Sequence, residues 1–248
     1  EIIEHSKLLL KNDAAKRVVN NGETKFLDNL HLLNIAVLNK KQLRILRNTI
    51  VARYGYKFKS EDLRKHFCRY DWYKGKYKNV DSLLSKRDKY LGKRISYFEY
   101  MDPDAKNVAE KEELVGIWNK SPVMAAGWSD HFIFDREGNF KFVFSQMSEL
   151  KMIESYSGTY EIKGNQLSLS VKTKTVINHS KEIEKDEVMG YSWTWSKAEK
   201  TEIDSTLNFH LPISKVHFDE KPEGMDFKRI FIRIGGGNYY KMRSEPEY

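Results

Sequence analysis

The sequence has few features that could stabilise or anchor it covalently. Its 248 residues include a single cysteine, Cys68, which excludes an internal disulfide and a cysteine-built metal site, since each needs at least two thiols. No apolar run approaches the roughly 18 residues of a membrane-spanning helix. With 40% hydrophobic and 13% aromatic residues, however, the chain can bury a sizeable core. These values predict a globular protein held together by noncovalent contacts.

Short motifs of common active sites are also missing. The seven histidines form no HExxH motif or other close ligand pair, and His210 and His217 would face opposite sides of one strand. There is no GxSxG motif, and the glycines at 235–237 are better explained by a hairpin turn than by phosphate binding. We therefore expect no enzymatic activity, no cofactor and no metal. A small barrel hydrolase or isomerase is the least favoured alternative.

Positive charge is concentrated in the first part of the chain. Residues 1–110 carry 24 Lys and Arg against 14 Asp and Glu, a net charge of +10, whereas the remainder carries 19 against 21, a net charge of −2. Within residues 40–95 the balance is 18 against 5. This asymmetry indicates two parts with different roles, of which the first could face a polyanion. A solvated, lysine-rich surface without a ligand is the alternative.

Helical signals dominate up to about residue 100. Asn39, with Gln42 three residues later, resembles a capping box, and Gly55 falls where a helix C-cap is expected, so a helix is predicted over about 40–54. Arg47 falls inside the apolar stripe of this helix. A guanidinium in that place needs its donors satisfied, so we expect it to anchor the helix through a carboxylate or backbone carbonyls, a ligand role being the alternative.

Two shorter helices are predicted to follow. Ser60 can cap one that carries Leu63 and Phe67, and Asp81 can cap another that carries Leu83, Leu84, Tyr90 and Leu91. Residues 1–38 have weak periodicity and give no clear prediction.

Beyond a polar stretch around Pro103 the pattern changes to alternation. Residues 131–145 and 156–177 alternate around glycine-containing turns, and both predict antiparallel hairpins. The later runs bring the total to about eight short strands, which predicts a meander closed into a barrel or folded into a sandwich. We favour an α+β protein with an antiparallel meander β-barrel. The predicted parts are an all-α domain over 1–101 with its core at 40–95, a linker over 102–113 and the barrel over 114–248.

The first predicted helix and the segments after it match the residue pattern of a known family. The matching positions are Leu43, Arg44, Arg47, Asn48, Ile50, Ala52, Arg53, Gly55, Phe58, Ser60, Leu63, Phe67, Trp72, Tyr73, Leu83 and Leu84. In this respect residues 40–95 resemble the YARHG domain, a small helical module of bacterial envelope and secreted proteins. Val51 stands where that family has tyrosine and Tyr54 where it has histidine, so no chemistry by the family histidine applies here. We expect these motif residues to be structural anchors: Arg47, Asn48, Ala52, Arg53, Gly55, Trp72 and Tyr73.

A GxW motif opens the first predicted strand of the second part. With Gly116 and Trp118, this stretch resembles the start of lipocalin-like barrels. The resemblance implies that Trp118 plugs the barrel floor. Trp128 is a candidate ligand-facing residue, although packing explains it better. The resemblance also implies an arginine of a late strand over the indole, with three candidates: Arg229, Arg233 and Arg243.

The sequence thus favours a non-enzymatic bacterial protein of the envelope or extracellular space, lipid-anchored or secreted and exported by a leader that precedes this sequence. Its helical part is expected to bind an anionic cell-wall polymer or membrane surface. Its barrel is expected to be a scaffold or to hold a small apolar ligand. A passive protein–protein interaction module is the alternative. Nucleic-acid binding is disfavoured, because only residues 70–80 interleave aromatic and basic side chains.

Overall fold

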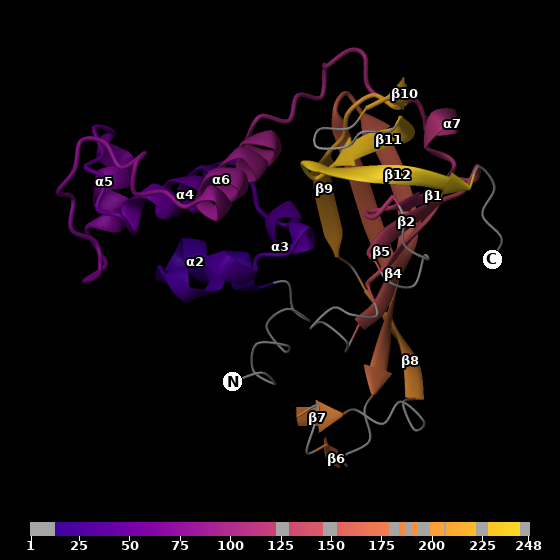
Figure 1. Cartoon of the computed structure of the whole chain (residues 1–248), viewed down its shortest axis with the longest axis horizontal. Helices are drawn as coiled ribbons and strands as arrows, with labels where there is room; N and C mark the ends of the chain where they lie inside the picture. Colours follow the sequence, from indigo (N-terminus) through magenta and orange to yellow (C-terminus); the bar gives the residue numbers. More distant parts are fainter. Residues whose placement is uncertain are drawn as a thin grey trace.

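Figure 1 shows a computed structural model of the chain, with a group of helices beside a strongly curled sheet. The structure describes residues 13–122, 129–145, 153–178, 184–186, 190–192, 199–205, 207–221 and 228–243. Trp128, the candidate ligand-facing residue, lies outside the described residues.

The described helices all precede the sheet in the chain. They are α2 (Ala14–Asn21), the 3-10 helix η1 (Thr24–Asn29), α3 (Leu32–Ala36), α4 (Lys40–Ala52), α5 (Glu61–Phe67), α6 (Lys86–Glu99) and α7 (Lys111–Leu114). Within the described ranges, none of these helices is long and apolar enough to cross a membrane.

Capping boxes fix where the two longest helices begin. At α4 the Asn39 side chain accepts from the backbone N–H of Gln42, and the Gln42 side chain accepts from the N–H of Asn39, both at 3.0 Å, which confirms the predicted start. The predicted helix start at Asp81 is wrong. Helix α6 begins after Ser85, whose side chain accepts from the N–H of Asp88 at 3.1 Å while Asp88 accepts from the N–H of Ser85. Asp81 lies in a turn, with no such reciprocal partner described at this position.

The second part is an antiparallel sheet. Its strands are β1 (Gly116–Asn119), β2 (His131–Phe134), β3 (Asn139–Val143), β4 (Ile153–Lys163), β5 (Gln166–Asn178), β8 (Glu199–Asp204), β9 (Asn208–Pro212), β10 (His217–Glu220), β11 (Arg229–Ile234) and β12 (Gly237–Arg243). The order is β10-β11-β12-β1-β2-β3-β4-β5-β8, and β9 also pairs with β5. The predicted hairpins β2–β3 and β4–β5 are confirmed. A separate ribbon joins β6 (Glu184–Asp186) to β7 (Gly190–Ser192).

The sheet curls until its two limbs meet. Just beyond β9, Ile213 forms an antiparallel bridge with Ile234 of β11, and the N–H of Ser214 donates to the carbonyl of Arg233 at 3.0 Å. A half-barrel results, with its limbs joined at this one point. This confirms the predicted α+β class with a barrel-like antiparallel sheet, whereas the lipocalin-like identity stays a prediction.

The GxW motif lies at the buried start of the sheet. Gly116 and Trp118 are both buried, and the Trp118 indole N–H donates to the carbonyl of Leu114 at 2.6 Å. A lysine lies over this indole, because the pairing of β1 with β12 sets Lys241 opposite Trp118, and the Lys241 Nζ lies 5.2 Å from the ring centre. The arginine implied by the resemblance stays a prediction. The three arginines considered from the sequence stand at other positions of β11 and β12: Arg229, Arg233 and Arg243.

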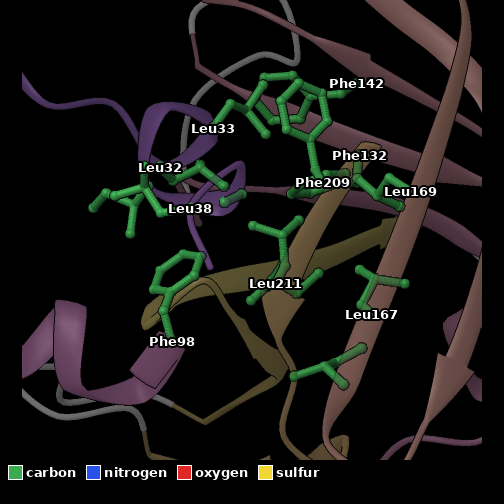
Figure 2. Packing of buried hydrophobic residues seen from close by; sticks show 14 of the residues in the cluster. Leu32, Leu33, Leu38, Phe98, Phe132, Phe142, Leu167, Leu169, Phe209 and Leu211 are labelled. Carbon is green, nitrogen blue, oxygen red and sulfur yellow. The ribbon is translucent and has the colours of Figure 1, made fainter. Parts of the chain in front are cut away.

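The helices and the half-barrel share one hydrophobic cluster. Leu32 and Leu33 of α3 and Phe98 of α6 pack against residues of the sheet such as Phe209 and Leu211 of β9, as Figure 2 shows. All five side chains are at most 1% exposed. Helix α3 therefore covers one side of the barrel interior and joins the two parts of the fold.

A polar contact between His31 and Asp130 also joins α3 to the sheet. His31, the N-cap of α3, accepts the N–H of Leu33 with its Nδ1 at 3.3 Å. The other ring nitrogen, Nε2, therefore carries the proton and faces the Asp130 carboxylate, also at 3.3 Å. Asp130 in turn accepts the N–H of Ser145 and lies 3.5 Å from the Nζ of Lys120. The contact satisfies a helix end and a buried carboxylate together.

The segment after α6 also follows the sheet closely. The N–H of Asp102 donates to the Asn165 side chain at 2.6 Å, and the N–H of Ala109 donates to the carbonyl of Ser214 at 3.1 Å. The division into a helical domain, a linker and a barrel stays a prediction, and it must accommodate these contacts and the shared cluster.

We expect Leu32→Ala to lower the free energy of unfolding of the whole chain by about 2–5 kcal/mol, the usual range for emptying a core leucine site. Because the cluster is shared, helical circular dichroism and the fluorescence of buried Trp118 should change in one transition. Leu83→Ala is the control, since that leucine is 47% exposed. Separate transitions for the two signals would show that the helices and the half-barrel fold independently.

Stability should also fall in mild acid. Burial lowers the pKa of His31, despite the opposing hydrogen bond to Asp130. The unfolded chain therefore takes up a proton near the ordinary histidine pKa of about 6.5, before the folded protein does, so stability is lost as the pH falls below that value. His31→Asn keeps a good N-cap without a titrating ring. Urea unfolding at pH 7.5 and 5.5 should show a smaller loss for this variant than for the wild type, and equal losses would contradict the assignment. The pKa of His66 is lowered as well, mainly by burial, but His66 is common to both proteins.

Candidate functional site

The arginine in the apolar stripe of α4 forms an ion pair. The Nε and one terminal nitrogen of Arg47 donate to the two carboxylate oxygens of Glu99, at 2.6 and 3.2 Å. The Arg47 side chain is 31% exposed and that of Glu99 only 6%. The hydrogen bond to Glu99 raises the pKa of Arg47, so this cation does not titrate in any ordinary buffer. The pair ties α4 to the end of α6.

The end of α4 converges on a second buried carboxylate, Asp88 of α6. Arg53 forms a short ion pair with one carboxylate oxygen of Asp88, and the Tyr54 hydroxyl donates to the other at 2.7 Å. The Ser85 hydroxyl donates to that second oxygen at 2.7 Å. Burial acts to raise the pKa of Asp88, but the hydrogen bonds from Ser85 and Tyr54 and the charge of Arg53 outweigh it and lower the pKa. Arg53 also reaches Asp28, at 3.4 Å.

The two departures from the family pattern have different surroundings. Tyr54, in place of histidine, supplies a hydrogen bond to Asp88. Val51, in place of tyrosine, is half-buried and packs against the cluster around Phe58.

The remaining motif residues support the helix ends and a second small core. Ala52 is buried, and Asn48 donates to the carbonyl of Arg44 at 2.8 Å. Gly55 has φ +79°, and a Cβ there would lie 2.8 Å from the carbonyl oxygen of Lys74, so the turn requires glycine.

The aromatic motif residues lie in this second core. Tyr73 is buried and donates its hydroxyl to the carbonyl of Tyr56 at 2.8 Å. Trp72 is 36% exposed and stacks on Tyr70, with ring centres 5.6 Å apart. The sequence predicted both as structural anchors, and of the two only Tyr73 is buried.

The rest of the positive charge lies on the surface. Among the 18 Lys and Arg residues within 40–95, four are half-buried and the others are exposed. The half-buried ones are Arg44, Arg47, Arg53 and Arg94. With 5 acidic residues in the same segment, most of these cations have no carboxylate to neutralise them.

A hollow of about 540 Å³ lies between α4, the segment at 78–84 and α6. Its apolar lining includes Ile50 and Val80, and three exposed lysines, Lys78, Lys89 and Lys93, also line it. None of these lysines forms a salt bridge with a residue in the ranges that the structure describes. Both Arg47 and Asp88 line it, but each already has its ion-pair partner. This lysine-lined hollow is the candidate functional site.

Sequence reasoning located part of this site. It identified Arg47 and the basic surface, and it expected a carboxylate or backbone carbonyls as the partner of Arg47, but it did not identify Glu99. The spacing of Arg47 and Glu99 on facing helices carries no local pattern. The hollow also depends on the path of residues 78–84, which were predicted to begin a helix.

The chain is an α+β protein in which a basic helical module, with a hollow on its surface, is joined to a half-barrel. Residues 30–99 match the family model of the YARHG domain, which covers the helices from α3 to α6. No curated protein and no solved structure matches the chain. A YARHG domain suggests an extracellular or envelope-associated protein.

We expect Arg47→Ala to lower the free energy of unfolding by about 1–3 kcal/mol, because it leaves the buried Glu99 carboxylate without its partner. Urea unfolding of the full chain at pH 7 measures this. Arg44→Ala is the control, since Arg44 pairs with Asp62 at an exposed position, where an ion pair contributes little. Equal effects of the two substitutions would mean that the Arg47 pair is no more important than a surface contact.

Proposed function

We propose that this protein is a non-enzymatic envelope or extracellular protein that binds an anionic surface polymer through its helical part. The lysine-lined hollow and the exposed cations around it form the binding face. The half-barrel acts as the scaffold on which this face is held. Lys78, Lys89 and Lys93, exposed and without salt bridges among the described residues, are the observation that supports the proposal most directly.

The chemistry of these side chains suits a flexible polyanion. A lysine ammonium is a compact point charge on a flexible stem, and it binds phosphate or carboxylate groups without requiring one fixed geometry. A cluster of such charges raises the local concentration of an anionic chain and speeds its association. In a bacterial envelope, polymers with phosphodiester or carboxylate groups provide such a partner.

The packing of the half-barrel supports a scaffold role over a ligand-holding role. Large aromatic residues that face its interior are fully buried, and Phe132 and Phe142 lie with ring centres only 4.6 Å apart. Leucines of α3 pack onto the same cluster. Side chains therefore occupy much of the interior that a small apolar ligand would need.

The proposal is tested with the full chain on purified bacterial cell wall, before and after chemical removal of its anionic polymers. Retention should fall when the polymers are removed and should weaken steeply as salt is raised, because exposed charges are screened within about 8 Å at physiological ionic strength. The double variant Lys78→Gln, Lys89→Gln should be retained less than the wild type at every salt concentration.

A matched control removes the same number of positive charges, two, from the half-barrel. Lys163→Gln with Lys172→Gln removes two exposed lysines of β4 and β5 and should leave retention close to that of the wild type. Equal losses for the two double variants would mean that net charge, and not this face, determines binding. Retention that ignores both polymer and salt would contradict the proposal and favour a protein partner.

A further inference from the structure

A second hollow, of about 340 Å³, is lined by residues of α6 and of the β11–β12 hairpin. Its lining has an unusual composition: two tyrosines, a lysine, two arginines, an asparagine and the two glycines of the turn. It contains neither a carboxylate nor an aliphatic side chain. Such a lining suits neither a lipid chain nor a cationic ligand. The volume falls at the lower end of the range for small-molecule sites, roughly 300–1,000 Å³.

The two sides of this cleft are held together by direct contacts. The Nε of Arg94, on α6, donates to the carbonyl of Gly235 at 3.0 Å, which orients the guanidinium and leaves its terminal nitrogens for other partners. Gly236, with φ +75°, lies so close to α6 that an added Cβ would be 2.9 Å from the Tyr97 ring. The cleft is therefore built by both parts of the protein, and it does not exist in either alone.

Two tyrosines of α6 present their rings on this side. Tyr90 and Tyr97 are 56% and 41% exposed, although side chains of this size usually bury more of their surface. They are seven residues apart, so they lie on one face of the helix, roughly 10 Å apart along its axis. A tyrosine offers a flat apolar face together with a hydroxyl, and it loses little conformational entropy on binding. This combination matches the apolar faces and hydroxyl edges of sugar rings.

Three cations surround the tyrosines. Lys93 and Arg94 come from α6 and Arg233 from β11. The acidic residue whose charge interacts with Arg233 is Glu220, and its carboxylate is already hydrogen-bonded to His217 at 2.8 Å. Arginine forms paired, charge-assisted hydrogen bonds with carboxylate and phosphate groups. The cleft therefore combines ring-stacking surfaces with cationic groups that can bind an anion.

We propose that this cleft between α6 and the β11–β12 hairpin binds an acidic saccharide, a sugar unit that carries a carboxylate or a phosphate. Tyr90 and Tyr97 contact the sugar rings, and Arg94 and Arg233 bind the anionic group. The enclosed size of the cleft favours a compact saccharide over an extended polyanion. This site is separate from the lysine-lined hollow, with which it shares only Lys93, and it does not depend on polymer binding there.

Titration calorimetry of the full chain tests the proposal with four probes: a disaccharide containing a uronic acid, the neutral disaccharide with the same linkage, a sugar phosphate and inorganic phosphate. We expect the uronic acid disaccharide and the sugar phosphate to bind more tightly than the neutral sugar or phosphate alone. Tyr90→Ala and Tyr97→Ala should each weaken binding of the acidic sugars by about tenfold, as for aromatic residues at the centre of a binding site. Arg233→Gln should weaken the acidic sugars and leave the neutral one unchanged.

Matched controls come from α6 and from the residue that follows it. Tyr100→Ala removes a tyrosine that is 63% exposed but does not line the cleft, and Lys89→Gln changes a lysine that lines only the other hollow. Neither should alter binding, and thermal melts should show that every variant remains folded. Absence of binding by both acidic sugars would overturn the proposal, as would phosphate binding as tightly as the sugar phosphate, which would indicate an anion site alone. Because Lys78 and Lys89 are not part of the cleft, loss of cell-wall retention in their variants and loss of saccharide binding are independent results.

Discussion

The buried carboxylate of Asp88 is the constraint on which the helical part depends. It completes the capping box at the start of α6, and it receives Arg53 and Tyr54 from the end of α4. A carboxylate in this position would be costly to bury without these donors. With them, it fixes how two helices meet, and the Arg47–Glu99 pair fixes their other end. Arg47 and Asp88, one residue from each of these two contacts, line the lysine-lined hollow. The shape of the hollow therefore depends on polar contacts made by the motif residues.

The motif therefore has a structural meaning that also accounts for Tyr54, which stands where the family pattern has histidine. Position 54 needs a side chain that can hydrogen-bond to Asp88, and the tyrosine hydroxyl does so at 2.7 Å. Arg53 forms ion pairs with both Asp88 and Asp28 of η1, so the segment before α4 belongs to the same network. Lys78, Lys89 and Lys93 take no part in this network of ion pairs and hydrogen bonds. The two proposed ligand surfaces both use α6, whose adjacent sides carry the lysines and the tyrosines, and Lys93 lines both hollows.

Local signals in the sequence predicted individual helices and hairpins, but they did not predict which distant segments pack or pair with one another. The Asn39–Gln42 capping box and the alternation around the turns at 136–138 and 164–165 predicted α4 and two hairpins, because these features depend on neighbouring residues only. Asp81 and Ser85 are both good N-cap residues, and the capping box that Ser85 forms with Asp88, three residues later, is the local signal that distinguishes them. The pairing of Arg47 with Glu99 and the packing of α3 on β9 are contacts between distant segments. No periodic pattern in the sequence indicates them.

The packing of α3 on β9 has a consequence for how the chain reaches its native state. Leu32 and Leu211 belong to one cluster, yet most of the chain is synthesised between them. Contacts between such distant segments carry a large loop-closure cost and slow the late stage of folding. Until β9 is made, the leucines of α3 remain uncovered, in a state prone to aggregation.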